Sequence, residues 1–292
     1  EGSVSAEIAK RALTMTGSSV TTRQYDGGKN ATVVVGELGN LVEGESLGMT
    51  TATGEFADKD VGANQNVSVK YTLVNGASTL KAGAPKFDSS GNVIGSLPVE
   101  VPGALASNYM LADEVLKGTI TQRVLEVGGI VANGKTYDGT DAATFSNQGA
   151  VSTGVDGESL TVTTTGAFTN KNAGARQVSA SSVLGNGEGG KASNYTLSNA
   201  SNTVNATIAQ KSVSVSGIVA DGKTYDGTTA ATVSNQGSVV TGVQGETLAV
   251  TTTGVFNDKN AGVRQVTTVT TLGDNGETLA SNYSLSNSEG SV

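Results

Sequence analysis

The sequence contains no cysteine, no histidine and no tryptophan, and only three of its 292 residues are proline. Without cysteine the chain has no disulfide, no thiol chemistry and no zinc–thiolate site. Without histidine it lacks the commonest general base, the Ser–His nucleophile pair and the commonest ligand of transition metals. Any enzyme built from this chain would have to work with carboxylates.

Positive charge is also scarce. The chain carries 18 basic and 26 acidic residues, a formal net charge of -8, and its lysines and arginines are scattered singly. A nucleic-acid surface needs a basic stripe to neutralise phosphates, so we expect no nucleic-acid partner. No apolar run approaches the roughly 20 residues that cross a bilayer, so we expect no membrane insertion of this chain. The opening EGSVSAEIAKRALTM lacks the layout of a signal peptide, which indicates a cut inside a longer protein.

The residues that are abundant favour strands and turns. Hydrophobic residues make up 36% of the chain, aromatic residues 4%, and there are 40 glycines. Cores must therefore be thin and made mostly of Val, Leu, Ile and Ala. Apolar residues alternate with polar ones, as at Val213 and Val215 or Leu248 and Val250. This period of two predicts half-buried strands, and no long segment has the spacing of an amphipathic helix.

Several short words recur three times in the same order. A strand-like opening reads AEIAKRALTM from Ala6, GTITQRVLEV from Gly118 and ATIAQKSVSV from Ala206. Gly-Glu-Ser/Thr-Leu, Gly-x-Phe and a Lys-Asp/Asn-Val/Ala-Gly word follow in each copy. The words Tyr-Asp-Gly and Ala-Ser-Asn-Tyr supply the recurrent motif residues, which are Tyr25, Asp26, Gly27, Tyr137, Asp138, Gly139, Tyr225, Asp226 and Gly227, and then Tyr109, Tyr195 and Tyr283. Words that recur in the same order along a chain predict an array of similar domains.

The spacing of the words predicts three modules, at 1–117, 118–205 and 206–292, the last of them truncated at its C-terminus. The first carries a 26-residue insertion near 75–103, which contains all three prolines. Its segment KFDSSGNVIGSL predicts a small hairpin around a Ser-Gly-Asn turn. Six to eight short strands in about 90 residues is the pattern of a small Ig-like β-sandwich. We therefore expect an all-β chain of three tandem sandwich modules in an elongated array. A β-grasp fold is the alternative, and it needs one helix.

The repeated words have direct physical interpretations. Asp-Gly is a turn dipeptide, in which Asp caps nearby backbone N–H groups and Gly takes a positive φ. A preceding Tyr buries its ring while its hydroxyl stays wet or finds a carbonyl. The Tyr of Ala-Ser-Asn-Tyr stands where a tyrosine corner would pin a loop across a sandwich. On this interpretation the words specify the fold.

The combination of KTYDGTxAAT, GExL, GxFxxKNAG and ASNYxLS, with ATIAQK between copies, resembles the YDG-type, MBG-related repeat modules of large bacterial surface proteins. Such modules are typical of filamentous-haemagglutinin-like adhesins exported by two-partner secretion, including biofilm-matrix adhesins. Copies two and three match over their full lengths, whereas copy one has Arg23-Gln24 before Tyr25, Gly28 after Tyr-Asp-Gly, and the insertion. The resemblance implies an extracellular stalk of tandem β-domains, and the family offers no catalytic residues.

Catalysis by carboxylate pairs, an isopeptide bond and calcium binding are the alternatives to a purely structural role of these words. Carboxylate pairs of the glycosidase type are conceivable at Asp138 with Glu158 and at Asp226 with Glu246, but turn acids are usually structural, so we expect no enzyme. An isopeptide bond would join the recurrent lysines to the recurrent asparagines. Calcium would use carboxylate oxygens, although the spacing matches no known calcium loop. The residues in question are Lys59, Lys171, Lys259, Asn108, Asn194 and Asn282 for the isopeptide bond, and Asp58, Asp60, Asp138 and Asp141 for calcium.

Two functions remain. The first is a monomeric stalk or spacer of a bacterial cell-surface adhesin, which holds a distal binding region away from the cell for adhesion or biofilm formation. In the second, the modules bind a matrix polysaccharide or a host glycan directly. The insertion of the first module is then the expected binding element, because long loops on rigid scaffolds often carry function.

Overall fold

A computed structural model describes residues 3–48 and 50–292. It is all-β, and among the described residues no α-helix occurs and no helix is long and apolar enough to cross a membrane. The helix required by the β-grasp alternative is therefore not found in the described chain, and the expectation of an all-β fold is confirmed. Three single-turn 3-10 helices, η1 (Ala106–Asn108), η2 (Ala192–Asn194) and η3 (Ala280–Asn282), each contain the Ala-Ser-Asn of the recurrent word.

The chain forms two compact units. Unit 1 holds the described residues up to Leu125 together with Thr153–Leu160 and Asn186–Thr196, and unit 2 holds the rest. Unit 1 therefore contains the first module and two loops of the second. Unit 2 contains the body of the second module and the third.

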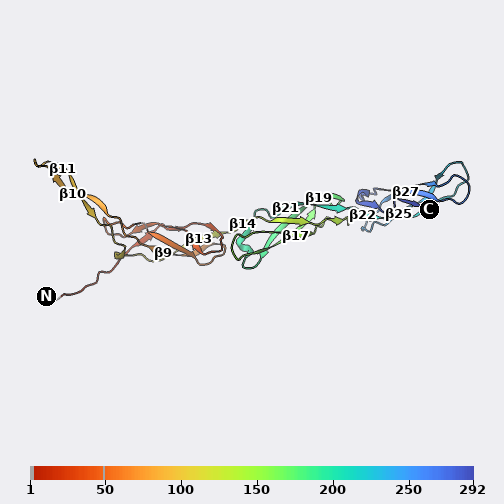
Figure 1. Ribbon diagram of the computed structural model, residues 1–292. Helices are drawn as coiled ribbons and strands as arrows, with labels where there is room; N and C mark the ends of the chain where they lie inside the picture. Colours follow the sequence, from red (N-terminus) through yellow and green to blue (C-terminus); the bar gives the residue numbers. More distant parts are fainter. Residues whose placement is uncertain (1–2, 49) are drawn as a thin grey trace. The chain divides into compact units, whose positions relative to one another are not determined.

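Unit 1 is built on a five-stranded sheet in the order β4-β13-β9-β8-β5. Figure 1 labels its long strands β9 and β13. The ladder of β3 and β6 packs on it through β13 and β8, which gives a small sandwich. The strands are β1 (Arg11–Ala12), β2 (Thr14–Thr16), β3 (Ser19–Val20), β4 (Arg23–Gln24), β5 (Asn30–Ala31), β6 (Val33–Val34), β7 (Glu37–Gly39), β8 (Thr51–Phe56), β9 (Gly62–Thr72), β10 (Thr79–Phe87), β11 (Val93–Val101), β12 (Tyr109–Met110), β13 (Glu114–Thr121), β14 (Arg123–Leu125) and β20 (Tyr195–Leu197).

Unit 2 contains two four-stranded sheets, in the orders β16-β21-β19-β18 and β24-β26-β27-β29. Two-stranded ladders face them, since β15 contacts β21 and β25 contacts β26. The strands are β15 (Gly128–Ala132), β16 (Lys135–Thr136), β17 (Phe145–Ala150), β18 (Leu160–Phe168), β19 (Gly174–Asn186), β21 (Ser201–Ala209), β22 (Lys211–Val213), β23 (Val215–Ala220), β24 (Ala230–Ala231), β25 (Val233–Val239), β26 (Ala249–Phe256), β27 (Val266–Gly273), β28 (Tyr283–Leu285) and β29 (Glu289–Ser291).

The recurrent strand-like word that ends one module and begins the next is divided between two sheets. Its first half closes the preceding module: β13 pairs antiparallel with β9, and β21 pairs antiparallel with β19. Its second half opens the following module, where β1, β14 and β22 lie beside β12, β20 and β28. The boundaries expected at 117/118 and 205/206 thus fall inside β13 and β21. Only the pairing of the strands shows which half of the word belongs to which module, because the sequence of the word is a continuous strand pattern.

The cores are thin, as the composition predicts. In the second module Tyr137, Phe168, Val178 and Ile208 form one buried cluster, at 3% exposure or less. The positions corresponding to Phe168 and Ile208 in the first module, Phe56 and Ile120, are each 1% exposed. Each closing strand therefore contributes one isoleucine to the core of the module it completes.

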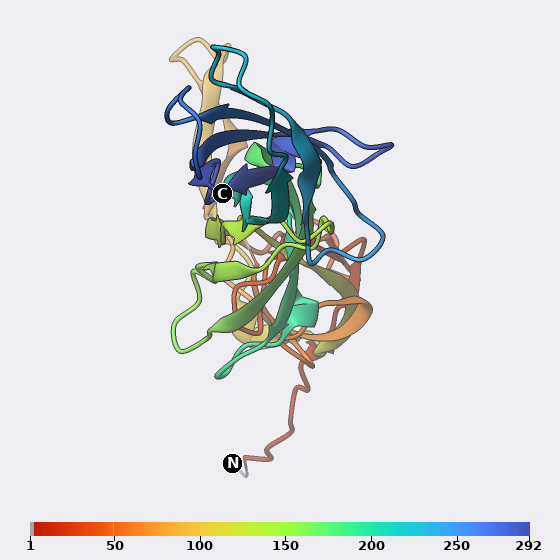
Figure 2. The ribbon, with the colours of Figure 1, turned by 90° about the vertical axis from the view of Figure 1, so that its right-hand side faces the viewer.

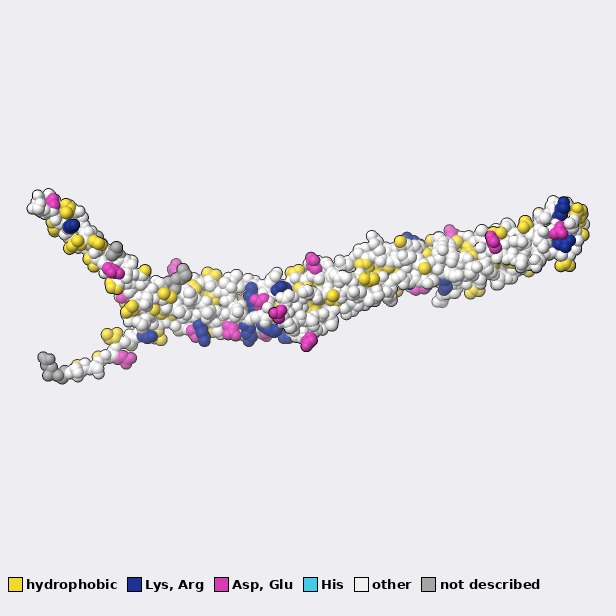
Figure 3. Space-filling view, viewed as in Figure 1, with side chains coloured by type: hydrophobic (Ala, Val, Ile, Leu, Met, Phe, Trp, Pro, Cys, Tyr) yellow, Lys and Arg dark blue, Asp and Glu magenta, His cyan; other side chains and the backbone are white. Residues whose placement is uncertain are grey.

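The insertion of the first module forms the hairpin of β10 and β11, as its sequence predicts. Its ends meet, because the N–H of Gly76 donates to the carbonyl of Ala104 at 2.8 Å. Hydrophobic side chains lie exposed along it (Figure 3). The hairpin is thus attached through one narrow point of the sandwich.

Candidate functional site

Each Tyr-Asp-Gly word forms the tight turn that its residues predict. The Asp side chain accepts from the N–H two residues ahead, at 2.9 Å in all three copies. The glycines Gly27, Gly139 and Gly227 have φ between +79° and +83°, a conformation that costs glycine little and other residues more. The turn therefore leaves the Asp exposed at one edge of each module, whereas the glycine is half-buried in the first two copies and exposed in the third.

A basic residue three positions before each Asp fastens the turn. Lys135 pairs with Asp138 at 2.8 Å and lies over the ring of Phe168 at 5.7 Å. Arg23 and Lys223 make the corresponding contacts in their own modules. Lys223 and the backbone and hydroxyl of Thr228 lower the pKa of Asp226 to about 2, so this carboxylate remains charged at neutral pH.

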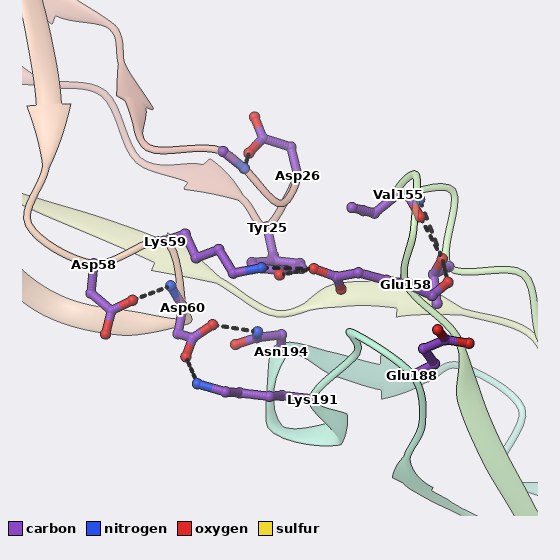
Figure 4. A network of polar contacts seen from close by, with 12 residues as sticks. Tyr25, Asp26, Asp58, Lys59, Asp60, Val155, Glu158, Glu188, Lys191 and Asn194 are labelled. Atoms are coloured by element: carbon purple, nitrogen blue, oxygen red, sulfur yellow. Dashed lines mark hydrogen bonds and ion pairs between the residues drawn. The ribbon is translucent and has the colours of Figure 1, made fainter.

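In unit 1 the tyrosine of this turn meets the loops that come from the second module. The hydroxyl of Tyr25 donates to Oε1 of Glu158 at 2.5 Å, and that of Tyr195 donates to Oε2 at 2.6 Å. The two rings meet edge to face, with centroids 5.4 Å apart. Figure 4 shows Glu158 pointing at Tyr25 and at the ammonium group of Lys59, which lies 3.0 Å from Oε1. We call this set of contacts the first junction.

An asparagine completes the first junction. Asn194, 1% exposed, accepts from the N–H of Val61 at 2.9 Å and donates to Asp60 at 2.8 Å. Lys191 forms an ion pair with the other oxygen of Asp60. The Asn of Ala-Ser-Asn-Tyr therefore caps the lysine-containing loop of the preceding module.

The electrostatics of the first junction favour a charged Glu158. Burial opposes ionisation, but hydrogen bonds from Tyr195, Tyr25 and Lys59 outweigh it and lower the pKa of this carboxyl. Burial and the adjacent carboxylate raise the pKa of both tyrosines, and the Glu158 bond raises the pKa of Lys59. One carboxylate thus holds three donors in place.

Unit 2 contains a second junction of the same design. Tyr137 and Tyr283 donate to the two oxygens of Glu246, at 2.7 and 2.5 Å, with ring centroids 5.5 Å apart. Burial, followed by the bond to Glu246, raises the pKa of Tyr137 to about 12. Asn282 accepts from the N–H of Ala173 at 2.8 Å and donates to Asn172 at 3.0 Å. A Tyr-Asp-Gly turn therefore pairs with the Gly-Glu and Asn-Tyr words of the next module.

The turn requires glycine for two reasons: its positive φ, and the close approach of a valine side chain from the next module. A Cβ on Gly27 would lie 2.5 Å from Cγ1 of Val155, and one on Gly139 would lie 2.8 Å from Cγ1 of Val243. Nothing lies within 4 Å of a Cβ on Gly227. The valine before Gly-Glu therefore packs directly on the preceding turn at both junctions.

Two sets of these words form no junction among the described residues. They are the Tyr-Asp-Gly turn of the third module and the Gly-Glu and Asn-Tyr words of the first module. Tyr225 is 62% exposed, against 1% for Tyr25 and 2% for Tyr137. In the first module Tyr109 already donates to Glu45, but Asn108 and Glu45 are exposed. Among the described residues, neither of these copies meets a second module.

The sequence-based chemical candidates have other partners in the structure. Asp226 bonds within its own turn, while Glu246 serves the two tyrosines, and Asp138 and Glu158 have equally separate partners. Lys59 and Asn194 bond to Glu158 and Asp60, not to each other, and Lys171 and Lys259 are exposed. The carboxylate of Asp138 accepts from Lys135 and Thr140, and Asp141 accepts through its backbone from Phe168.

The calcium candidates do not form a cluster. The oxygens of Asp60 accept from Lys191 and Asn194, and Asp58 accepts from the N–H of Asp60 at 3.1 Å. In the described ranges no group of three or more Asp or Glu residues is placed to hold a metal. Calcium binding remains a prediction, with chelation as its test.

Sequence reasoning missed the pairing across modules. It placed Asp138 with Glu158 inside one module, whereas Glu158 bonds to Tyr25, 133 positions away. It also expected the tyrosine hydroxyls to stay wet or to find a carbonyl, whereas at both junctions they donate to carboxylates. The available signal was that Glu and both tyrosines recur together in every copy, but recurrence does not say which copies meet.

A comparison with known families also finds three repeats in the chain. The model of the YDG domain matches residues 9–80, 121–204 and 209–290, and each match leaves out most or all of the closing strands β13 and β21. Comparisons with curated proteins and with solved structures gave no match. The three matches together cover most of the sequence, and the chain therefore belongs to the YDG domain family.

Proposed function

We propose that the chain is a spacer segment of a bacterial cell-surface adhesin, in which YDG modules dock on one another and hold a distal binding region away from the cell. The observation that carries this proposal is the recurrent junction. Two different module pairs bury a carboxylate between two tyrosines and cap the adjacent loop with an asparagine.

These contacts favour a fixed connection over a flexible linker. The closing strand of one module runs directly into the opening strand of the next, with only Gln122 between β13 and β14. The side chain of this residue donates to the carbonyls of Ser193 and Tyr195 at 3.1 and 3.0 Å. A short, hydrogen-bonded connection of this kind resists bending, which is what a spacer requires.

Small-angle X-ray scattering of the chain, with calcium and with a chelator, tests the proposal. A strand of eight to ten residues spans roughly 30 Å, so a spacer of three modules predicts a particle on the order of 100 Å or longer. An extended particle in both conditions supports a spacer that does not need calcium. A compact particle in both conditions contradicts the spacer.

A disulfide across the first junction sharpens this test. A Cβ built on Gly27 lies 3.8 Å from Cβ of Val155, within the range that disulfides require. In a Gly27→Cys/Val155→Cys variant we expect spontaneous oxidation, and a scattering curve that superposes on that of the reduced form. A curve that changes on oxidation would mean that the junction bends in solution.

The hairpin of β10 and β11 supports a second candidate function, direct binding to a glycan or another surface polymer. Among its described side chains, Phe87, Val93, Ile94 and Leu97 are each more than half exposed. Such a group of apolar side chains on an attached hairpin is typical of a contact surface. This candidate assigns binding to the first module alone.

Removal of the hairpin separates the two functions. Since Gly76 already bonds to Ala104, deletion of residues 77–102 with a short glycine link should leave the sandwich folded. The spacer proposal predicts an unchanged profile of binding to glycan arrays and to extracted matrix polysaccharide. Loss of binding by a folded deletion variant would assign binding to the hairpin instead.

A further inference from the structure

Each junction brings together two tyrosine rings that come from different modules. Tyr25 and Tyr195 have ring centroids 5.4 Å apart and ring planes at 78°, and Tyr137 and Tyr283 have centroids 5.5 Å apart and planes at 77°. These are the separations and angles of an edge-to-face aromatic pair. All four rings are 3% exposed or less, so each pair is held in a fixed contact inside the protein.

The hydroxyl ends of each ring pair converge on one carboxylate. Tyr25 and Tyr195 donate to the two oxygens of Glu158, and the pair of the second junction donates in the same way to Glu246. The ortho carbons of a phenol flank its hydroxyl, so the ortho carbons of the two rings lie at these converging ends. Two phenoxyl radicals couple through their ortho carbons. Each junction therefore brings together the atoms that react in an oxidative tyrosine cross-link.

The shared carboxylate also accepts the proton that a tyrosine loses on oxidation. Loss of one electron makes a phenol strongly acidic, and a hydrogen bond to a base lets the proton leave with the electron. The lowered pKa of Glu158 keeps this carboxyl ionised at neutral pH, so it is available as the base. A cavity of about 520 Å³, lined in part by Asp26, Lys59 and Asp156, borders Glu158 and gives the proton a route to solvent.

The two rings of a pair are held by separate modules on hydrogen-bonded segments. The N–H of Tyr25 donates to the last carbonyl of β13 at 2.9 Å, and that of Tyr137 donates to the last carbonyl of β21 at 2.9 Å. Tyr195 and Tyr283 begin β20 and β28, which pair with β14 and β22. Figure 2 shows the modules as strand arrows joined by loops. A bond between the two rings would therefore connect the strand frameworks of two folded modules.

We propose that each junction is a site of oxidative modification, at which a peroxide acting through a one-electron oxidant joins the two tyrosines as dityrosine. Each phenol gives one electron to the oxidant and one proton to the carboxylate, which passes it to solvent. The two radicals form a carbon–carbon bond between ortho positions, and the ortho hydrogens return to the oxygens. The two electrons and two protons reduce one hydrogen peroxide to two waters. The bond joins consecutive modules of a chain that has no cysteine for a disulfide.

Photo-oxidation by ruthenium tris-bipyridyl with persulfate tests these sites, because its one-electron transfer needs no contact with a buried ring. The test uses a dilute Tyr225→Phe variant, since Tyr225 is 62% exposed and would couple between chains. We expect dityrosine fluorescence and a monomer whose mass falls by two hydrogens for each junction. Mass spectrometry of the digested protein should recover peptides joined through two tyrosine pairs. These pairs are Tyr25 with Tyr195 and Tyr137 with Tyr283.

Each junction is the matched control for the other. Tyr25→Phe keeps the ring and its packing, and it should abolish the first link while the second forms as before. Tyr137→Phe should do the reverse. Glu158→Gln keeps a hydrogen-bond acceptor but removes the base, so the first link should form about tenfold more slowly or less, at an unchanged rate of the second. An unchanged rate of the first link in Glu158→Gln would contradict the carboxylate as proton acceptor.

Two other tyrosines separate the effect of the ring contact from that of the carboxylate. Tyr71 and Tyr109 donate to Glu114 and Glu45, but no other described tyrosine ring contacts theirs, so they should stay unlinked. Links to these two that are as frequent as the junction links would overturn the proposal. So would a monomer that loses no hydrogen under conditions that couple a free tyrosine peptide. The result is separate from the spacer proposal, which scattering of the unoxidised chain tests.

Discussion

The two junctions have the same arrangement of tyrosines, carboxylate and asparagine, but they differ in charge. In unit 1, Glu158 also binds Lys59, and Asp60 pairs with Lys191. In unit 2, Asn172 takes the place of Asp60, Leu279 takes the place of Lys191, and no ion pair between described residues crosses the junction. The shared elements are therefore sufficient for a junction, and the ion pairs are additions to it.

The burial of the groups explains why the tyrosines and their carboxylate are shared and the lysine pairs are not. The hydroxyls of Tyr25 and Tyr195 belong to rings that are 1% and 2% exposed, so a lost partner leaves a buried polar group. The side chain of Lys191 is 61% exposed and keeps most of its water whether it is paired or not. The tyrosines and the shared carboxylate should therefore dominate the stability of both junctions.

Removal of the shared carboxylate should have the largest effect. Glu158→Leu or Glu246→Leu leaves two buried hydroxyls without an acceptor, and we expect a loss of about 3–5 kcal/mol in the local free energy of opening. Native-state hydrogen exchange of the surrounding loops measures it. Glu45→Leu is the comparison, because exposed Glu45 accepts from the single tyrosine Tyr109, and its cost should be smaller, about 1 kcal/mol or less. Equal exchange rates in all three variants would mean that the shared carboxylate does not dominate the stability of the junction.

Substitution of the turn glycine should come next. Gly27→Ala and Gly139→Ala combine a strained positive φ with a clash against a valine, for an expected cost of about 2–4 kcal/mol. Gly227→Ala has the same φ but open space, so it should cost only about 1 kcal/mol. Urea titration followed by hydrogen exchange compares the three. A Gly227→Ala variant that is as unstable as the other two would show that only the φ matters.

Acid should weaken the first junction. The pKa of Glu158 is lowered in the folded chain, so its contribution is fully present above the pKa of an unfolded Glu, about 4.3, and is lost as the pH falls through the folded value. Hydrogen exchange of residues 153–160 below pH 4.5 measures this loss. In Glu158→Gln the acid dependence of this segment should be reduced, and an unchanged dependence would assign it to another group.

Alkali should weaken both junctions. The pKa values of Tyr25, Tyr137, Tyr195 and Tyr283 are raised, so the stability they contribute is complete below about pH 10 and is lost as the pH rises through the folded values. Absorbance of ionised tyrosine during a pH titration measures it. Simultaneous ionisation of these four tyrosines below pH 10 would contradict their burial.

Exchange of the ion pair between the junctions should have the smallest effect. Asp60→Asn/Lys191→Leu gives unit 1 the residues found in unit 2, and we expect a change of about 1 kcal/mol or less, together with a weaker dependence on salt. Stability in low and in high sodium chloride measures both. A large loss in the double variant would mean that the first junction depends on its charges.

Local features followed from the sequence because they depend on neighbouring residues. The Asp-Gly turns, the glycines with positive φ and the hairpin of the insertion involve contacts within a few positions along the chain. Period-two alternation similarly predicted strands and thin cores. The site followed only in part: the motif residues were identified, but the partner of Tyr25 lies 133 positions away, and three identical copies of each word allow several pairings.

The sequence by itself determined the all-β class, the threefold repeat, the turns and the absence of cysteine and histidine chemistry, because composition and short-range spacing decide these features. Only the tertiary structure decided that β13 and β21 close the preceding modules, and that Glu158 and Glu246 each join two tyrosines from different modules. The physical reason is that burial and hydrogen-bond satisfaction belong to the folded neighbourhood. Identical words therefore differ in exposure according to which strand and which carboxylate reach them.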